Sequence, residues 1–245
     1  MSKKYELKPS NYASMKPIKF NGDRPLSDKR TIKAPFINES GFFMIVVGKP
    51  KSGKTTFVFN MLMNKEIYKK VFKNIIYVAP VASRKNVNNN PLSDLDDEYL
   101  FDNLTIGVQR RAEENKRIYD ETPEKHYNQL LLIDDCTAFL KEKSNIQMLN
   151  ELVMNRRHIS LSIILLTQYV ISIPPALRSQ YNAIVIFKPV KKDYERINKE
   201  IMFMKKEEFI NFIDFVFKDR HDNLFINVDN ENDYYKNLQK IVISD

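Results

Sequence analysis

The sequence predicts an α/β fold whose core is a mostly parallel β-sheet with helices on both faces. Continuous apolar runs of strand length recur along the chain, as expected for strands that are buried on both faces. Segments with helical periodicity alternate with these runs, which is typical of a parallel sheet covered by helices. In addition, a glycine- and lysine-containing segment joins the first apolar run to the first helical segment.

The predicted strands are six apolar runs, and the first of them begins where the character of the chain changes, after Gly41. They span residues 42–47, 74–81, 130–133, 161–167, 183–187 and 224–228. Helical spacing predicts helices over residues 53–64 and 206–217. It predicts a third helix capped by Ser144, with one apolar face made by Ile146, Leu149, Leu152 and Val153.

Composition narrows the class of protein. Hydrophobic residues make up 43% and charged residues 29% of the 245 residues, enough for a sizeable core in one α/β domain. The single cysteine, Cys136, excludes a disulfide scaffold, and the three histidines are too widely spaced to suggest a metal site. No apolar run approaches the roughly 20 residues of a membrane span. We therefore expect an intracellular, soluble protein with no transmembrane segment.

Residues 1–40 are expected to form an extended basic N-terminal arm, followed by one domain over residues 41–245. The arm contains four prolines and no sustained periodicity. Its nine Lys and Arg against four Asp and Glu account for +5 of the chain's net charge of +8. Such an arm is either a solvated tail or a segment that follows a phosphate backbone or an acidic partner surface.

The segment after the first predicted strand matches the phosphate-binding pattern G-x-x-x-x-G-K-[ST] in full. Its glycines allow the backbone N–H groups to turn inward, and the helix that follows adds its positive end. Lys54 is then expected to reach the β- and γ-phosphates, and Thr55 to bind Mg²⁺. The flanking strand favours this interpretation over a simple glycine turn. The predicted ligands of ATP are Gly48, Lys49, Pro50, Lys51, Ser52, Gly53, Lys54, Thr55 and Thr56.

Two carboxylates, Asp134 and Asp135, follow the strand at residues 130–133. Ligands of open α/β sheets gather beyond the carboxyl ends of the strands. Asp134 is therefore predicted to hold Mg²⁺, and Asp135 to polarise the attacking water. A strand that simply runs into a turn gives the same pattern, but its combination with the phosphate loop favours the catalytic interpretation.

Further polar residues flank the strand at residues 161–167. Gln168 ends it and either caps the strand or hydrogen-bonds the γ-phosphate or the lytic water. Arg156 and Arg157 precede it, and Arg178 follows. Adjacent arginines after a helix are usually solvated or bind a carboxylate. In a ring of ATPases, an arginine here can instead stabilise the transition state in a neighbouring subunit.

The order of these motifs resembles the DNA-packaging ATPases of large double-stranded DNA viruses, the poxvirus-type branch of the FtsK–HerA superfamily. The resemblance covers about residues 41–190. It rests on the phosphate loop, the run Asn74 to Pro80, the pair Asp134-Asp135, Arg157-His158 ahead of a strand that ends in Gln168, and the segment Ala183 to Lys188.

The resemblance implies a RecA-like P-loop NTPase core and a homo-oligomeric ring, either a hexamer or a pentamer. It also implies ATP-driven movement of double-stranded DNA into a capsid, a capsid or portal partner, and a location in the host cytoplasm at the assembly site or in the virion. Gln168 would be the sensor, the residue that reports hydrolysis of the γ-phosphate to the rest of the domain. Arg157 would be a trans-acting arginine finger, which reaches the γ-phosphate bound to a neighbouring subunit, with Arg156 as its substitute. One departure is Asp135, because many relatives carry Glu at that place.

The alternatives are other P-loop ATPases, such as a helicase-like translocase, a nucleotide-binding switch or a small-molecule kinase. A GTPase is disfavoured because Asn64 to Ile67 lacks the Asp of the guanine-reading pattern N-K-x-D. A kinase would need an arginine-rich lid. Arg110 and Arg111 could provide one, but no acceptor pocket is evident in the sequence.

Overall fold

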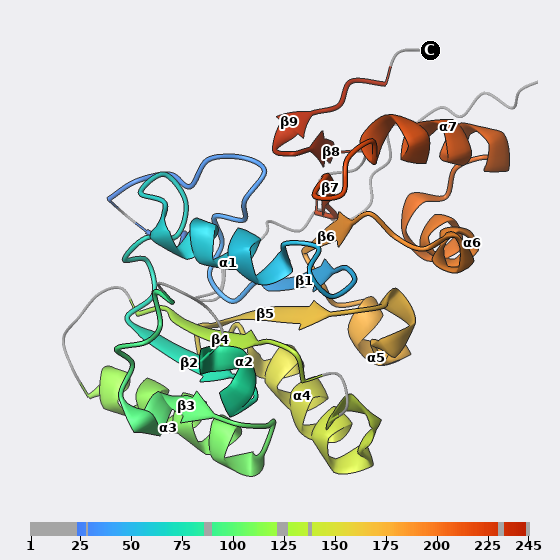
Figure 1. The fold of residues 1–245 in the computed structure, drawn as a ribbon. Helices are drawn as coiled ribbons and strands as arrows, with labels where there is room; N and C mark the ends of the chain where they lie inside the picture. Colours follow the sequence, from blue (N-terminus) through green and yellow to red (C-terminus); the bar gives the residue numbers. More distant parts are fainter. Residues whose placement is uncertain are drawn as a thin grey trace, which may run out of the picture.

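The computed structural model describes residues 24–27, 29–85, 90–121, 127–136, 139–229 and 233–243 (Figure 1). In the described residues one sheet has the strand order β3-β2-β4-β5-β1-β6-β7-β8-β9. The strands are β1 Phe43–Val47, β2 Asn74–Val78, β3 Leu100–Phe101, β4 Gln129–Ile133, β5 Leu161–Thr167, β6 Ala183–Phe187, β7 Asn223–Asn227, β8 Asp233–Lys236 and β9 Gln239–Lys240. All six predicted strands are present, so the α/β prediction is confirmed.

Strand direction decides which residues meet at one edge of the sheet. The strands from β3 to β6 are parallel, whereas β7, β8 and β9 pair antiparallel. The last residue of β1, Val47, is in register with Thr167 of β5. Because β7 runs the other way, its first residue, Asn223, pairs with Phe187 at the end of β6. The carboxyl ends of β1, β4, β5 and β6 and the amino end of β7 therefore share one edge.

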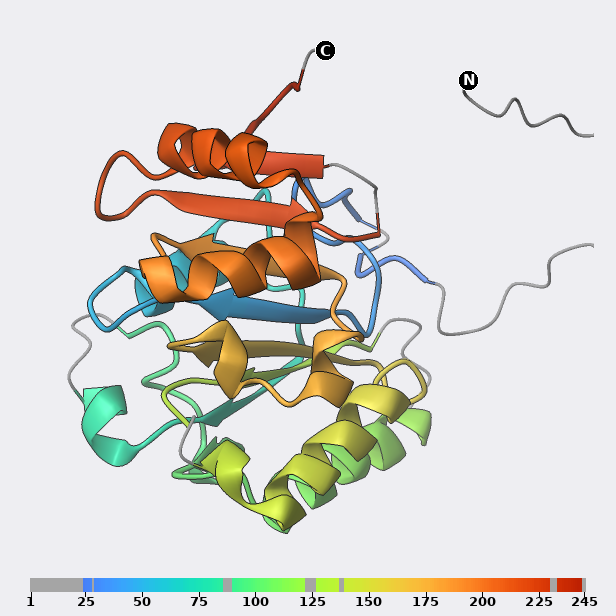
Figure 2. The same cartoon turned by 90° about the vertical axis from the view of Figure 1, so that its right-hand side faces the viewer.

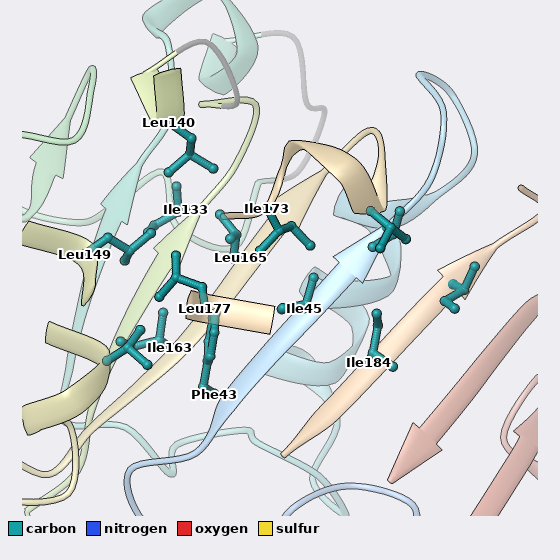
Figure 3. Close-up of a cluster of buried hydrophobic side chains, with 14 of the residues drawn as sticks. Phe43, Ile45, Ile133, Leu140, Leu149, Ile163, Leu165, Ile173, Leu177 and Ile184 are labelled. Carbon is teal, nitrogen blue, oxygen red and sulfur yellow. The ribbon is translucent and has the colours of Figure 1, made fainter. Parts of the chain in front are cut away.

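Helices cover both faces of the sheet, as predicted (Figure 2). They are α1 Lys54–Met63, α2 Val81–Lys85, α3 Ile106–Asp120, α4 Lys143–Asn155, α5 Pro175–Arg178, α6 Tyr194–Ile197 and α7 Lys206–Val216. Alternate residues of β1 point to opposite faces, so that Met44 packs with α1 and Ile45 with α4 and α5. Figure 3 shows the cluster of buried side chains on the face of the sheet that α4 and α5 cover, in which Ile45 lies near Leu177. None of the helices in the described ranges has the length and apolar character needed to cross a bilayer.

Two features differ from the sequence expectation. Helix α4 begins at Lys143 with Glu142 at its N-cap, so Ser144 lies inside the first turn and does not cap it. Helix α3 was not predicted, because it is polar and buries only Val108, Ala112 and Asn115. Ion pairs of Arg117 with Glu114 and Glu121 lie along its exposed face. Such pairs support a helix without leaving an apolar pattern in the sequence.

The described part of the predicted arm, residues 24–27 and 29–40, packs against the domain. Leu26, Ile32, Phe36 and Ile37 are buried in the cluster on the α1 face of the sheet. Arg24 donates hydrogen bonds to the carbonyl of Tyr127, at 2.7 Å, and to the hydroxyl of Ser160. Residues 1–23 and 28 lie outside the described residues. The domain boundary after residue 40 stays a prediction, but the residues just before it belong to the hydrophobic core.

Candidate nucleotide-binding site

The phosphate loop connects β1 to α1 at the edge where the strands end (Figure 1). The amide of Gly48 donates to the carbonyl of Thr167 at 3.1 Å, which ties the loop to β5. A Cβ atom on Gly48 would lie 2.6 Å from Ser52 Oγ and 2.7 Å from Phe187 Cβ. Gly53 has a φ of 104°, a conformation that side chains disfavour. The backbone therefore requires glycine at both positions of the motif.

Lys54 lies within the curve of this loop. Its Nζ donates to the carbonyl oxygens of Gly48, at 2.7 Å, and Lys49, at 3.1 Å. Burial lowers the pKa of the Lys54 ammonium, and the carboxylates of Asp134 and Asp135 oppose this shift. The buried hydroxyl of Ser52 has no hydrogen-bond partner among the described residues. The loop thus contains a cation and an unsatisfied hydroxyl, both suited to an anionic ligand.

Thr55 and Asp134 meet although they come from different elements. The Thr55 hydroxyl, in the first turn of α1, donates to Asp134 Oδ2 at 2.8 Å. Asp134 is held by its own amide, which donates to the carbonyl of Val78 at 2.8 Å. Burial raises the pKa of Asp134, while the Thr55 hydroxyl and the Lys54 ammonium act in the opposite direction.

These two oxygen groups are of the kind that Mg²⁺ prefers. In the described part of the chain, no cluster of three or more His, Cys, Asp or Glu could hold a metal. An ion held by few protein ligands, with phosphate and water oxygens completing its coordination, is the usual arrangement for Mg²⁺ with a nucleotide.

Asp135 has different surroundings from its neighbour. It is exposed and adopts a left-handed conformation with a φ of 55°. Its Oδ2 accepts a hydrogen bond from Ser83 of α2 at 3.1 Å. The two adjacent carboxylates therefore have different environments. Asp134 is buried against Thr55, whereas Asp135 is exposed to solvent. Ser83 carries no sequence signal, because α2 is only five residues long.

Gln168 lies beside the phosphate loop. It is half-buried at the end of β5 and lines a small pocket together with Gly48, Lys49 and Phe187. The next residue, Tyr169, has its ring 4.9 Å from Lys192 Nζ. Gln168 thus lies next to Gly48 and Lys49 of the phosphate loop.

The three predicted arginines do not lie at the phosphate loop of their own chain. Arg156 and Arg157 occupy the turn before β5, so the seven residues of this strand place them about 20 Å from Gln168. Arg156 is buried and donates to the carbonyls of Val153, at 2.6 Å, and Gln180, at 3.3 Å. Arg156 is therefore not a solvated arginine. Arg157 is exposed, and Arg178 forms an ion pair with Glu200.

Like Ser83, His221 is a residue of the candidate site that the sequence did not predict. His221, in the turn between α7 and β7, has its Nδ1 3.0 Å from the carbonyl oxygen of Ser52. A strand over residues 224–228 was predicted, but its direction was not. The antiparallel pairing of β7 with β6 is what brings His221 to the phosphate loop.

The phosphate loop between β1 and α1, with an acidic residue at the end of β4 facing Thr55, defines the fold of a P-loop NTPase. Comparison with known proteins then gives the family. The model of the Poxvirus A32 protein family matches residues 31–240, and the chain belongs to this family. The resemblance noted in the sequence is thereby confirmed.

Individual relatives are viral proteins. Protein 075L of Invertebrate iridescent virus 6 is 30% identical over 186 residues, and the match covers 74% of this chain and 65% of that protein. Protein 015R of Frog virus 3 is 27% identical over 150 residues, covering 60% of this chain and 44% of the relative. The matched part of the chain thus spans less than two thirds of either relative.

Among solved structures, the genome packaging NTPase B204 from Sulfolobus turreted icosahedral virus 2, in complex with ATP-gammaS, has a similar fold. The TM-score is 0.55 at 20% sequence identity, and the match covers 80% of this chain and 95% of B204.

Proposed function

We propose that this protein is an ATP-hydrolysing motor that translocates double-stranded viral DNA into the capsid. The observation that carries the proposal is the hydrogen bond between Thr55 and Asp134, which brings a hydroxyl and a carboxylate together next to the loop that contains Lys54 and so supports a nucleotide and Mg²⁺ site. Membership in the Poxvirus A32 protein family and the fold shared with a genome packaging NTPase support a role in DNA packaging.

In this proposal the loop residues 48–56 bind the phosphates of ATP, chiefly through backbone N–H groups at the start of α1. Lys54 exchanges its carbonyl partners for the β- and γ-phosphates. Thr55 and Asp134 would hold Mg²⁺, and the ion would supply positive charge close to the phosphates. The short contact between their oxygens supports these roles.

Asp135 and Gln168 act on the water and the γ-phosphate. Asp135 is exposed and oriented by Ser83, so its carboxylate is available to polarise water. It is shorter than the Glu common in the wider superfamily, and the bond to Ser83 fixes its direction. Gln168 hydrogen-bonds the γ-phosphate or the lytic water and reports hydrolysis to β5, consistent with its place in the pocket beside Gly48.

We place this chemistry in a homo-oligomeric ring, a hexamer or a pentamer. Arg157 is exposed at the edge of the sheet opposite its own phosphate loop, a position from which it can reach the site of a neighbouring copy. Arg156 is buried, and the side chain of Arg178 is only 17% exposed, so exposure favours Arg157 as the trans-acting finger.

The partners and location follow from the same proposal. The net charge of +8, with an excess on residues 1–40, supports contact with the phosphate backbone of double-stranded DNA. A capsid or portal component would receive the DNA, in the host cytoplasm at the assembly site or in the virion. In this scheme residues 1–40 are the basic arm and residues 41–245 the ATPase domain.

The test is the rate of ATP hydrolysis with and without long duplex DNA, at low and moderate salt. Stimulation by DNA that weakens as salt rises is expected of a motor that grips phosphates. A rate that ignores DNA would contradict the motor and favour a nucleotide switch or a kinase. The Lys54→Ala variant controls for contaminating activity.

A further inference from the structure

The strand order places the residues of the candidate site on two sides of β1, which predicts how a nucleoside triphosphate would lie on the loop. Asp134 on β4 and Gln168 on β5 lie on one side of β1, and β6 and β7 lie on the other side. In the proposed function, the γ-phosphate and Mg²⁺ face Asp134, Thr55 and Gln168. On that arrangement, the α-phosphate and the nucleoside would extend to the other side of β1, toward β6 and β7.

His221 and Phe187 lie on this second side. A Cβ atom built on Gly53 would be 3.5 Å from His221 Nδ1 and 3.5 Å from Phe187 Cε1. The bond of His221 to the carbonyl of Ser52 fixes one edge of the imidazole against the loop. The residue is exposed, so part of its imidazole is accessible to a ligand on this side of the loop.

The turn that carries His221 is held from within the domain. The buried carboxylate of Asp222 accepts hydrogen bonds from the amide of Asp219, at 2.8 Å, and the side chain of Asn237, at 2.7 Å. Lys236 Nζ is 3.4 Å from the same carboxylate. Burial alone would raise the pKa of Asp222, but these partners outweigh it and hold the pKa below its ordinary value. The imidazole is thus positioned by an anchored turn.

We propose that His221 forms the nucleoside side of the ATP site and stacks its exposed ring face on the base. This inference rests on the proposed function, because it requires that the phosphate loop bind a nucleoside triphosphate. Stacking on an aromatic ring is available to every base, so the contact adds affinity for nucleotides without strong choice among bases. The hydrogen bond to Ser52 keeps the ring in place for this contact.

The experiment compares the binding of two probes, Mg²⁺-ATP and Mg²⁺-tripolyphosphate, by calorimetry on the full chain. Tripolyphosphate has the phosphates but no nucleoside. His221→Ala is expected to weaken ATP binding about tenfold and to change tripolyphosphate binding less than about twofold. His221→Phe, which keeps an aromatic ring but loses the hydrogen bond to Ser52, is expected to recover part of the ATP affinity that His221→Ala loses. His158→Ala, at an exposed histidine on the opposite edge, is the matched control.

The outcomes separate the two proposals. Equal weakening of both probes in His221→Ala would mean that His221 only shapes the loop, and would overturn the inference while leaving the ATP site intact. Unchanged ATP binding in His221→Ala would overturn it as well. If the parent protein binds neither probe, the nucleotide function itself fails and the inference with it. The melting temperature of each variant shows that it is folded.

Discussion

Lys54 Nζ lies 2.7 Å from the carbonyl oxygen of Gly48, six residues earlier in the chain. The ammonium of the phosphate loop is therefore bound by the backbone of the loop that it serves. Its charge is already in place before any phosphate arrives, and only its hydrogen-bond partners need to change. Such preorganisation is what makes electrostatic stabilisation effective.

Replacing this cation should separate binding chemistry from folding. Lys54→Ala is expected to reduce ATP turnover more than about 100-fold, because it removes the charge that we propose meets the β- and γ-phosphates. Phosphate release measures the rate, and circular dichroism should show an unchanged fold. Turnover at the parent rate would refute the site assignment.

Asp134→Asn keeps the shape of the side chain and removes its charge. We expect turnover to fall about 100-fold and the Mg²⁺ concentration for half-maximal rate to rise, because the amide is a poorer ligand for a hard cation. A Mg²⁺ titration of ATP hydrolysis measures both effects. An unchanged Mg²⁺ dependence would remove Asp134 from the metal site.

A finger that acts in trans can be tested by mixing two inactive variants. Arg157→Ala should bind ATP normally but lose turnover, and Asp135→Asn should lose turnover for a different reason. Mixed rings then contain some sites with an intact Asp135 beside an intact Arg157 from the neighbour. Partial recovery of ATP hydrolysis in the mixture is expected, and its absence would count against a trans-acting finger.

Phe36 tests the role of the residues before the predicted domain boundary. Its ring contacts those of Tyr68 and Phe225, with centroids 5.9 Å and 5.5 Å away. Phe36→Ala is expected to lower the free energy of unfolding by about 3 kcal/mol, measured by urea denaturation. Phe203→Ala, at a phenylalanine that is 79% exposed, should change it by less than about 0.5 kcal/mol. Equal effects would show that Phe36 is not part of the core.

Cys136 should be chemically inert in the folded protein. Burial, with Asp134 and Asp135 nearby, raises the pKa of its thiol to about 12. Only about one thiol in ten thousand is then ionised at pH 8, and the thiolate is the reactive form. Alkylation by iodoacetamide should be slow in buffer and fast in denaturant. Rapid labelling of the native protein would contradict the buried position.

The sequence alone was sufficient to predict the six longer apolar strands and the phosphate loop. Parallel strands that are buried on both faces are apolar throughout, which makes runs such as Leu161–Thr167 visible without any partner. The loop is visible because its glycines are required by the backbone at Gly48 and Gly53. Burial on both faces and a backbone that requires glycine each restrict the residue types at consecutive positions, so both can be recognised from the sequence alone.

The features that the sequence did not predict depend mainly on contacts between residues far apart in the chain. Nothing in the residues around His221 tells that β7 is antiparallel, so its contact with Ser52 could not be predicted. The burial of Arg156 depends on the carbonyl of Gln180, 24 residues away. Helix α3 is stabilised by charged pairs and a narrow contact with the sheet, which give it little apolar periodicity.

The hydrogen bonds of Arg24 have a consequence at the far end of the sheet. Its guanidinium joins the carbonyl of Tyr127, just before β4, to the hydroxyl of Ser160, just before β5. These are the two strands whose other ends lead into Asp134 and Gln168. Arg24 thus ties the residues that precede the predicted domain to the amino ends of the two strands that lead into the candidate site.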